Sequence, residues 1–548
     1  MPNLPKTTAF IALLLLSLPA HADDMAMQTG DTLEPLPAKD WTPAAAAHLL
    51  RRAGFGGSVA DAQRLHAMGL DAAVGSLLDW EGKPDPDVPA PRIFQTTRPG
   101  RTQYMAAGSE DARRKLRQEW RRRDFMQFAV IREWWIQMML RTRHPLRERM
   151  TLLWHGHFTS SMRDVRNSYH MYLQNTLLRR HAAGNFRDLL HAISKDPAML
   201  EYLDNRQNRK GHPNENYARE VMELFTLGTG NYSEQDIKEA ARALTGWTFG
   251  GNRFVFNKAQ HDDGSKTIMG RTANFDGDQF LDLVLGQKAA PRYLAAKIFR
   301  YFAHDYPNEA VTNGLAQTLA SHDWELKPML RTLFRSRAFY GPYARGTQIK
   351  SPVVLLVGLG RSLDLDPELL VGGSALAAQL GQELMAPPNV KGWPGGRDWI
   401  TTSILLERYN LCGTLVGAQQ DKARGMSRQG RGQVYRLRRM MEKNLEPADD
   451  EAESMEMTPP TRQRGRGRPA PTYDVLATVR DRELEAPNAI LDHFCTTLFA
   501  NEVNAELRAT LADYLVRDGG YPQNARAQRE RLHGLLRLIV STPEFQLN

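Results

Sequence analysis

The sequence predicts a mainly α-helical fold, with one large multi-helix domain, a small β-hairpin element and a disordered insertion. Helix-start signals recur along the chain, and the first is Thr42-Pro43, an N-cap followed by proline at the first helical position. Apolar residues recur at the spacing of a helix face, for example Phe128, Ile131, Trp135 and Met138. Strand signals are few, since only residues 253–256 and 267–269 are expected to pair, as one small hairpin, and no βαβ series appears.

The helices can be placed in order from their start and stop residues. The first is expected over residues 44–53 and ends at Gly54. Helical patterning continues to the C-terminus, and it resumes at Tyr473 after a charge-rich stretch. Caps or helix-initiating prolines mark further starts, at Ser58 with Asp61, Pro145, Asp196-Pro197, and Ser233 with Asp236.

Composition places the chain among ordinary globular proteins. It has 548 residues, 42% hydrophobic and 24% charged, which is enough to bury a large core. Two cysteines cannot form the framework of a disulfide scaffold. The formal net charge of +9 is modest for this length and, with export, argues against nucleic-acid binding.

Residues 1–22 have the pattern of a secretory signal peptide. Lys6 precedes an apolar run over residues 10–18, and Ala20-His21-Ala22 fits the small-x-small cleavage pattern. An uncleaved anchor is the alternative, but the run is shorter than the roughly 20 residues of a spanning helix. Cleavage would lower the formal charge to +8, and no later run looks able to span a membrane. We therefore expect export to the periplasm or the extracellular space.

The remaining chain divides by composition. A main helical domain is expected over residues 40–440, with a proline-rich and then basic segment at 83–123. Residues 440–472 have the composition of a disordered linker or insertion, and 473–548 are expected to form helices that pack on the main domain. Cys412 and Cys495 flank the insertion; they are either bridged or two buried free thiols.

The first candidate site is Trp154-His155-Gly156-His157-Phe158. Two histidines at i and i+2 point about 200° apart on a helix, but can share one side of an extended chain. Because Gly156 stands where the helix is expected to end, His155 and His157 are candidate ligands of a divalent metal, with Glu220 as a third. The alternative is a helix-terminal histidine beside a packed one.

The second candidate site is the helix expected from about residue 215. Asn216, Glu220 and Glu223 form a strip beside its apolar face, where unpaired carboxylates are costly. Glu223 and Glu215 are the predicted catalytic acid/base residues. The alternative is a boundary strip that forms salt bridges with nearby arginines.

Other polar residues are predicted to bind substrate. Asparagines near this helix would orient it, Arg219 and Lys266 would hold an anionic group, and two loops would supply a polar turn and an aromatic platform. The full set is Asn205, Asn208, Asn214, Asn216, Arg219, His261, Asp262, Lys266 and Trp393. A plain polar turn at 261–266 and a packed structural loop at 387–396 are the alternatives.

Six segments of the chain together carry a family resemblance: 48–56, 154–158, 214–226, 239–248, the His261-Asp262 turn and 387–393. They resemble the bacterial family known as domain of unknown function 1800, although Val221 stands where leucine is usual in that family. The resemblance implies export, a mostly helical domain and association with a second exported family of sulfatase-like fold, but no established activity.

Two functions remain open from the sequence. One is an exported hydrolase, metal- or carboxylate-dependent, that acts on an envelope or extracellular polymer. The other is a noncatalytic polysaccharide-binding protein or an assembly partner of a sulfatase-like exported protein.

Overall fold

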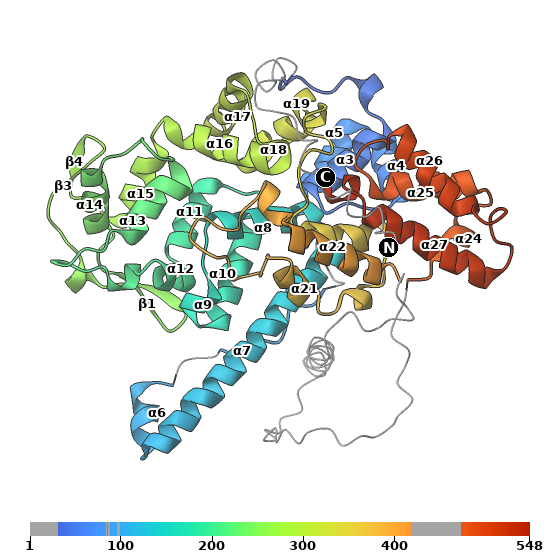
Figure 1. Cartoon of the computed structure of the whole chain (residues 1–548). Helices are drawn as coiled ribbons and strands as arrows, with labels where there is room; N and C mark the ends of the chain where they lie inside the picture. Colours follow the sequence, from blue (N-terminus) through green and yellow to red (C-terminus); the bar gives the residue numbers. More distant parts are fainter. Residues whose placement is uncertain (1–30, 84, 86–87, 96–98, 418–472) are drawn as a thin grey trace, which may run out of the picture.

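The computed structural model describes residues 31–83, 85, 88–95, 99–417 and 473–548. The predicted signal peptide and the 440–472 insertion lie outside these residues. Within them the predicted fold class is confirmed, because helices dominate and the strands form two small antiparallel pairs (Figure 1). No helix among the described residues is both long and apolar enough to cross a bilayer.

The N-terminal helices begin where their caps predict. They follow the short turn η2 (Ala38–Asp40) and are α3 (Pro43–Ala53), α4 (Val59–Met68) and α5 (Leu70–Leu78). The Thr42 side chain accepts the Ala45 N–H, and Ser58 and Asp61 form a reciprocal capping box. Local hydrogen bonding therefore sets these starts.

The basic segment is helical and forms an arm that projects from the body of the molecule (Figure 1). It comprises α6 (Arg101–Ala106) and the outer half of α7 (Glu110–Arg141). The inner half of α7 is buried through Phe128, Ile131 and Trp135, as their spacing predicts. One helix thus has a solvated basic end and a core-forming end.

The centre of the molecule is built on α8 (Pro145–His157) and α10 (Ser168–Arg180). Glu148 on α8 is fully buried and accepts hydrogen bonds from Arg179 at 2.6 and 2.9 Å and from Trp135 at 2.9 Å. Paired in this way, a buried charge holds α7, α8 and α10 together. Short elements complete this region: α9 (Met162–Val165), α11 (Phe186–Ser194), α12 (Pro197–Tyr202) and η3 (Asn205–Gln207).

The two strand segments expected to pair with each other belong to separate hairpins. β1 (Trp247–Gly250) pairs with β2 (Arg253–Phe256), and β3 (Lys266–Ile268) pairs with β4 (Arg271–Ala273). Each strand turns back locally: Met269 and Gly270 have φ of 50° and 75°, as in the tight turns that suit hairpins. The prediction of one hairpin was therefore wrong in its pairing. Neighbouring elements are α13 (Asn216–Glu220), η4 (Val221–Thr226), α14 (Glu234–Ala243) and η5 (Lys258–Gln260).

The rest of the chain covers these elements and completes two clusters of buried apolar side chains. The helices that follow the hairpins are α15 (Gly277–Leu285), α16 (Ala289–Phe302), α17 (Glu309–Ser321), α18 (Leu326–Arg335) and α19 (Arg337–Tyr340). Next come α20 (Pro352–Ser362), η6 (Pro367–Leu370), α21 (Gly373–Gln379), η7 (Gly396–Trp399) and α22 (Thr402–Leu415). The C-terminal elements are α24 (Val475–Asp481), α25 (Pro487–Leu498), α26 (Ala505–Val516), α27 (Ala525–Val540) and η9 (Glu544–Gln546).

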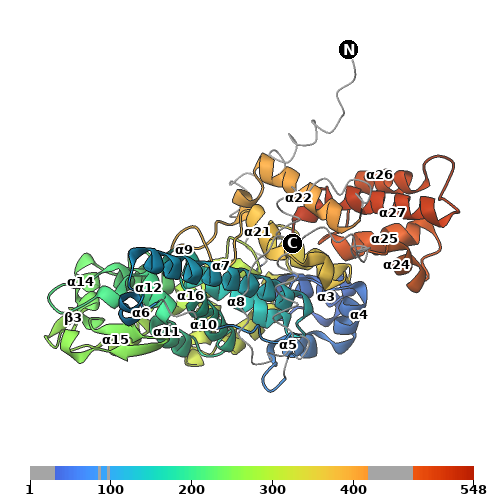
Figure 2. The same ribbon diagram turned by 90° about the horizontal axis from the view of Figure 1, so that it is seen from below.

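The C-terminal helices lie at one end of the elongated body (Figure 2). They contact α20, α22 and α4. Cys412 on α22 and Cys495 on α25 are both buried and both free thiols. Of the two alternatives for this pair, the structure shows the unbridged one.

Candidate functional site

A cavity of about 790 Å³ lies where four segments far apart in the sequence meet. Its lining includes His157 at the end of α8, Glu223 in η4, and Val390 and Lys391 in the 387–393 loop. Helix α16 supplies much of the remaining wall. The histidine motif, the glutamate helix and the tryptophan loop, each singled out in the sequence, therefore share one site.

The 387–393 loop lies against the end of α8 through a close backbone contact. Gly392 has φ of +91°, and a Cβ at this position would stand 2.5 Å from the carbonyl oxygen of Gly156. Only glycine allows this approach. The adjacent Trp393 packs over His155, with ring centroids 5.3 Å apart.

Glu223 lies in a π-helical turn. Helix α13 continues directly into η4, whose hydrogen bonds span one residue more than those of an α-helix. The turn is tied to its neighbours, because Phe225 O contacts His157 Nε2 at 3.1 Å and Leu224 O accepts the Tyr293 hydroxyl at 2.8 Å. π-Turns of this kind occur frequently at functional sites.

Two carboxylates stand near each other on this segment. Glu223 lines the cavity and accepts a hydrogen bond of 2.9 Å from the Tyr232 hydroxyl. Glu220, three residues earlier, is half-buried; burial raises its pKa, the charge of Glu223 raises it further, and Arg219 and Lys391 oppose the shift. The pair therefore includes one carboxyl, that of Glu220, whose pKa lies above its ordinary value.

Lys297 and His157 line the same cavity, and the pKa of each side chain is lowered. Burial lowers the pKa of Lys297 to about 8. Burial also lowers the pKa of His157 well below its usual range, and the charge of Lys297 adds to this. His157 Nε2 contacts a backbone carbonyl, so Nδ1 is left without a hydrogen-bond partner.

The two histidines do not share one side of an extended chain. Helix α8 continues through His157, so the expected end of the helix at Gly156 was wrong. His155 packs between Trp135 and Trp393, its Nε2 has no partner, and burial lowers its pKa to about 3. His157 instead contacts Phe158 and Phe225.

This arrangement does not suit the predicted metal site. Among the described residues, no group of three His, Cys, Asp or Glu side chains is placed to hold a metal ion. A divalent metal at His155, His157 and Glu220 stays a prediction. It can be tested by metal analysis of the purified protein beside His155→Ala and Glu220→Ala.

The predicted substrate-binding asparagines form hydrogen bonds within the fold. The Asn208 amide donates to Asn205 Oδ1 at 3.1 Å and to Ala241 O at 2.8 Å, and its oxygen accepts the Asn214 N–H at 3.0 Å. Asn214 in turn accepts the backbone N–H of Asn216 at 3.0 Å. This chain connects the η3 turn to the start of α13, while Asn205 Nδ2 has no partner.

Arg219 and Glu215 point to an ion-pair cluster rather than to the cavity lining. Arg219 donates to both carboxylate oxygens of Glu234 at 2.8 Å and to Glu215 at 3.3 Å. Neither residue lines the cavity. The predicted catalytic role of Glu215 and anion-holding role of Arg219 stay predictions, and the observed contacts give them no support.

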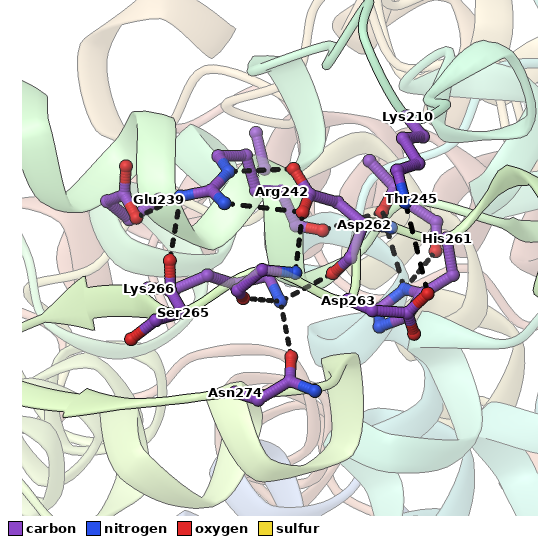
Figure 3. A network of polar contacts seen from close by, with 12 residues as sticks. Lys210, Glu239, Arg242, Thr245, His261, Asp262, Asp263, Ser265, Lys266 and Asn274 are labelled. Carbon is purple, nitrogen blue, oxygen red and sulfur yellow. Dashed lines mark hydrogen bonds and ion pairs between the residues drawn. The ribbon is translucent and has the colours of Figure 1, made fainter.

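The 261–266 turn forms a second polar network, apart from the cavity lining (Figure 3). Arg242 donates to both carboxylate oxygens of Asp262, at 2.8 and 3.2 Å, and lowers the pKa of that carboxyl to about 2. Lys266 Nζ donates to Asp262 O, Gly264 O and Asn274 Oδ1, and His261 Nδ1 contacts Thr245 O at 2.9 Å. Because these groups bond to one another, the network stabilises the turn that precedes β3.

Sequence reasoning missed the residues that α16 contributes. Lys288 lies just before its first turn, and Arg292, Tyr293, Lys297 and Arg300 line the cavity from the helix itself. The available signal was Lys297 beside the buried residues Leu294, Ile298 and Phe299, a charge at the edge of an apolar face.

Among the described residues, the fold and the site define a mainly helical protein with a cavity lined by a helix end, a π-helical turn, a second helix and a loop. A family model described as "Protein of unknown function (DUF1800)" matches residues 48–547, so the chain belongs to this family. Searches of curated proteins and of solved structures found no match. The family confirms the resemblance read from the sequence and supplies no activity.

Proposed function

We propose that the protein is an exported hydrolase whose active site is the cavity at Glu223. The observation that carries the proposal is Glu223 in a cavity wall that also presents Lys297 and Lys391, with Glu220 near enough for the charge of Glu223 to raise its pKa. Two carboxyl groups, one acting as an acid and the other as a base, are the usual groups that cleave a glycosidic bond, and they also serve ester hydrolysis.

The two carboxylates divide the proton transfers. Glu223, oriented by the Tyr232 hydroxyl, accepts a proton from the attacking water while the water oxygen forms a bond to the reacting carbon. Glu220 in its protonated form donates a proton to the leaving oxygen as the carbon–oxygen bond breaks. Afterwards Glu223 returns its proton to solvent and Glu220 regains one, so the net reaction is addition of water across the bond.

The position of Glu223 supports its role. A π-turn anchored at both Phe225 O and Leu224 O holds its backbone on two neighbouring helices. The hollow of about 790 Å³ has room for part of a substrate, and the anchored turn holds the Glu223 carboxylate in position beside it.

The test compares Glu223→Gln and Glu220→Gln with wild type on a panel of chromogenic glycosides and esters. We expect each substitution to lower kcat by about 10²- to 10⁴-fold, the usual contribution of general acid–base catalysis. Glu234→Gln is the matched control, because Glu234 is exposed and lies outside the cavity lining. Activity that survives in both folded variants would refute the assignment.

Turnover on no member of the panel, with specific binding of a polysaccharide, would favour the second function. The protein would then be a noncatalytic polysaccharide-binding or assembly partner of a sulfatase-like exported protein. Copurification with such a protein from the native envelope fraction would support that alternative.

Export is part of the proposal and rests on the N-terminal pattern. The basic residue, the 10–18 apolar run and Ala20-His21-Ala22 favour cleavage after Ala22. Intact-mass measurement of the protein recovered from the periplasm or medium should give a chain that begins at Asp23. A full-length chain in the cytosolic fraction would contradict export.

A further inference from the structure

The charge of the cavity wall is strongly one-sided. Its lining includes Lys288, Arg292, Lys297, Arg300 and Lys391, whereas Glu223 is the one acidic side chain that the described residues contribute to it. These basic residues come from two segments about 90 residues apart in sequence, so the concentration of charge is a product of the fold. We infer that this wall binds an anionic group, and that the substrate of the proposed hydrolase is a polymer bearing sulfate, phosphate or carboxylate substituents.

Among the described residues the lysines of the wall form no ion pair with a carboxylate, although the charge of Lys391 acts on Glu220. Within the part of the chain that the structure describes, Lys297 lies over the face of Tyr293, at 5.7 Å from the ring centroid, and Lys288 and Lys391 form no ion pair. Other cations of the protein are paired where a carboxylate is near, as Lys195 is with Asp278 at 2.6 Å. The cavity therefore concentrates unneutralised positive charge.

The two arginines of the wall are only partly engaged. Arg292 pairs with Glu309 at 3.3 Å, and both side chains are exposed. Arg300 Nε donates to the backbone oxygen of Asp305 at 3.2 Å, which leaves the charge of the guanidinium unneutralised. A guanidinium group with free N–H donors can bind sulfate, phosphate or carboxylate through two parallel hydrogen bonds.

Lys297 gives the clearest reason for an anionic ligand. Burial of an ammonium group without a counter-ion is unfavourable, and the lowered pKa of this lysine reflects that cost. An anion bound against α16 would restore the lost stabilisation. Arg219 and Lys266, the cations predicted from the sequence for this task, already bond to the protein's own oxygens.

Glu223 sets where the anionic group can lie. Because its carboxylate would repel the anion, the anion belongs on the α16 and Lys391 side, and the bond to be cleaved belongs at Glu223. This division fits a polymer whose charged substituent stands beside the scissile bond. The substrate class rests on the proposed function, whereas anion binding itself does not.

Direct binding measurements on the protein as it is recovered after export test the inference. The probes are inorganic sulfate, inorganic phosphate, a sulfated oligosaccharide, an oligouronate and a neutral oligosaccharide of equal length, measured by calorimetry. We expect an anionic oligosaccharide to bind at least 10-fold more tightly than the neutral one, with affinity that falls as salt rises. The preferred probe identifies whether sulfate, phosphate or carboxylate is the recognised group.

Variants locate the binding to the cavity. Lys297→Gln and Lys391→Gln should each weaken binding of the best anionic probe at least 5-fold. Because Lys391 is exposed, its variant should fold and can still test the inference if the variant of the half-buried Lys297 does not fold. The matched control is Lys238→Gln, an exposed lysine on α14 outside the cavity lining, which should leave affinity unchanged.

Glu223→Gln separates this inference from the proposed function. It should retain or tighten anion binding, because a repelling charge is removed, while turnover is lost. Anion binding without turnover in wild type would refute the hydrolase and leave the anion site standing. Equal affinity for neutral and anionic probes, or unchanged binding in both folded lysine variants, would overturn the inference whatever the enzyme does.

Discussion

The packing of the 387–393 loop against α8 should depend on Gly392. Gly392 has φ of +91°, where an L side chain costs roughly 1–2 kcal/mol. An alanine Cβ would also stand 2.5 Å from the backbone oxygen of Gly156, and neither atom can move away without a shift of the backbone. The loop must then lift, and the packing of Trp393 against His155 is lost.

The expected cost of Gly392→Ala combines these two effects. Loss of part of a tryptophan contact is worth about 1.5 kcal/mol at the usual value for apolar burial. With the conformational cost, we expect the free energy of unfolding to fall by about 3 kcal/mol. Because Lys391 is the neighbouring residue, binding of an anionic probe to the cavity should weaken as well.

Two glycines of the same chain region separate the contributions. Gly396 has φ of +59° with open space at its Cβ position, so Gly396→Ala should cost only the conformational part, about 1 kcal/mol. Gly395 has an ordinary φ of −125° and open space, so Gly395→Ala should change stability by less than about 0.5 kcal/mol. Urea unfolding followed by circular dichroism measures all three variants. Equal losses at Gly392 and Gly396 would refute the close approach as the reason for glycine.

Further predictions concern the core and its titration. Glu148→Ala leaves Arg179, whose side chain is only 10% exposed, without its carboxylate, and should lower the free energy of unfolding by about 3–5 kcal/mol. Arg64→Ala breaks an exposed pair with Asp61 and should lower it by less than about 1 kcal/mol. Urea titration measures both variants, and a similar loss in the two would contradict this prediction. Burial raises the pKa of Asp196 to about 7, so the folded state keeps a proton that the unfolded chain releases near pH 4. The free energy of unfolding should therefore fall as pH rises from about 4 to 7, by at most about 4 kcal/mol. Asp196→Asn should flatten that slope in unfolding measured at several pH values, and an unchanged slope would show that the carboxyl is not its source. Because Cys412 and Cys495 are free, a reducing agent should not change the urea midpoint, and two thiols should react only after denaturation; one disulfide in the intact mass would contradict the structure.

Several features were predictable because a few neighbouring residues decide them. The Ser58–Asp61 and Ser233–Asp236 capping boxes close between residues three apart, and both form as their spacing predicts. The helical class follows from many such signals, together with apolar spacing along α7. The strand pairing failed, because 253–256 and 267–269 each resemble strands locally and the choice of partner lies outside that local pattern.

The candidate site was predictable only in pieces. Glu223, His157 and the tryptophan loop were each notable for their residue types, but their meeting at one cavity depends on how α8, η4 and α16 pack. Lys297 was overlooked, since a single lysine near an apolar face usually reaches solvent. Arg219 was interpreted as an anion ligand because its pairing with Glu234 is formed across a turn that the sequence pattern does not describe.

The sequence by itself determined the helical class, most helix starts and family membership, because caps, prolines and apolar periodicity act within one or two turns of a helix. It also marked the polar residue types from which a site can be built. Only the tertiary structure decided which carboxylates and cations remain unpaired, and that separates Glu223 and Lys297 in the cavity from Glu215 and Arg219 outside it. The physical reason is that pairing and desolvation depend on contacts between helices distant in sequence, and these contacts set both the charge and the pKa of a side chain.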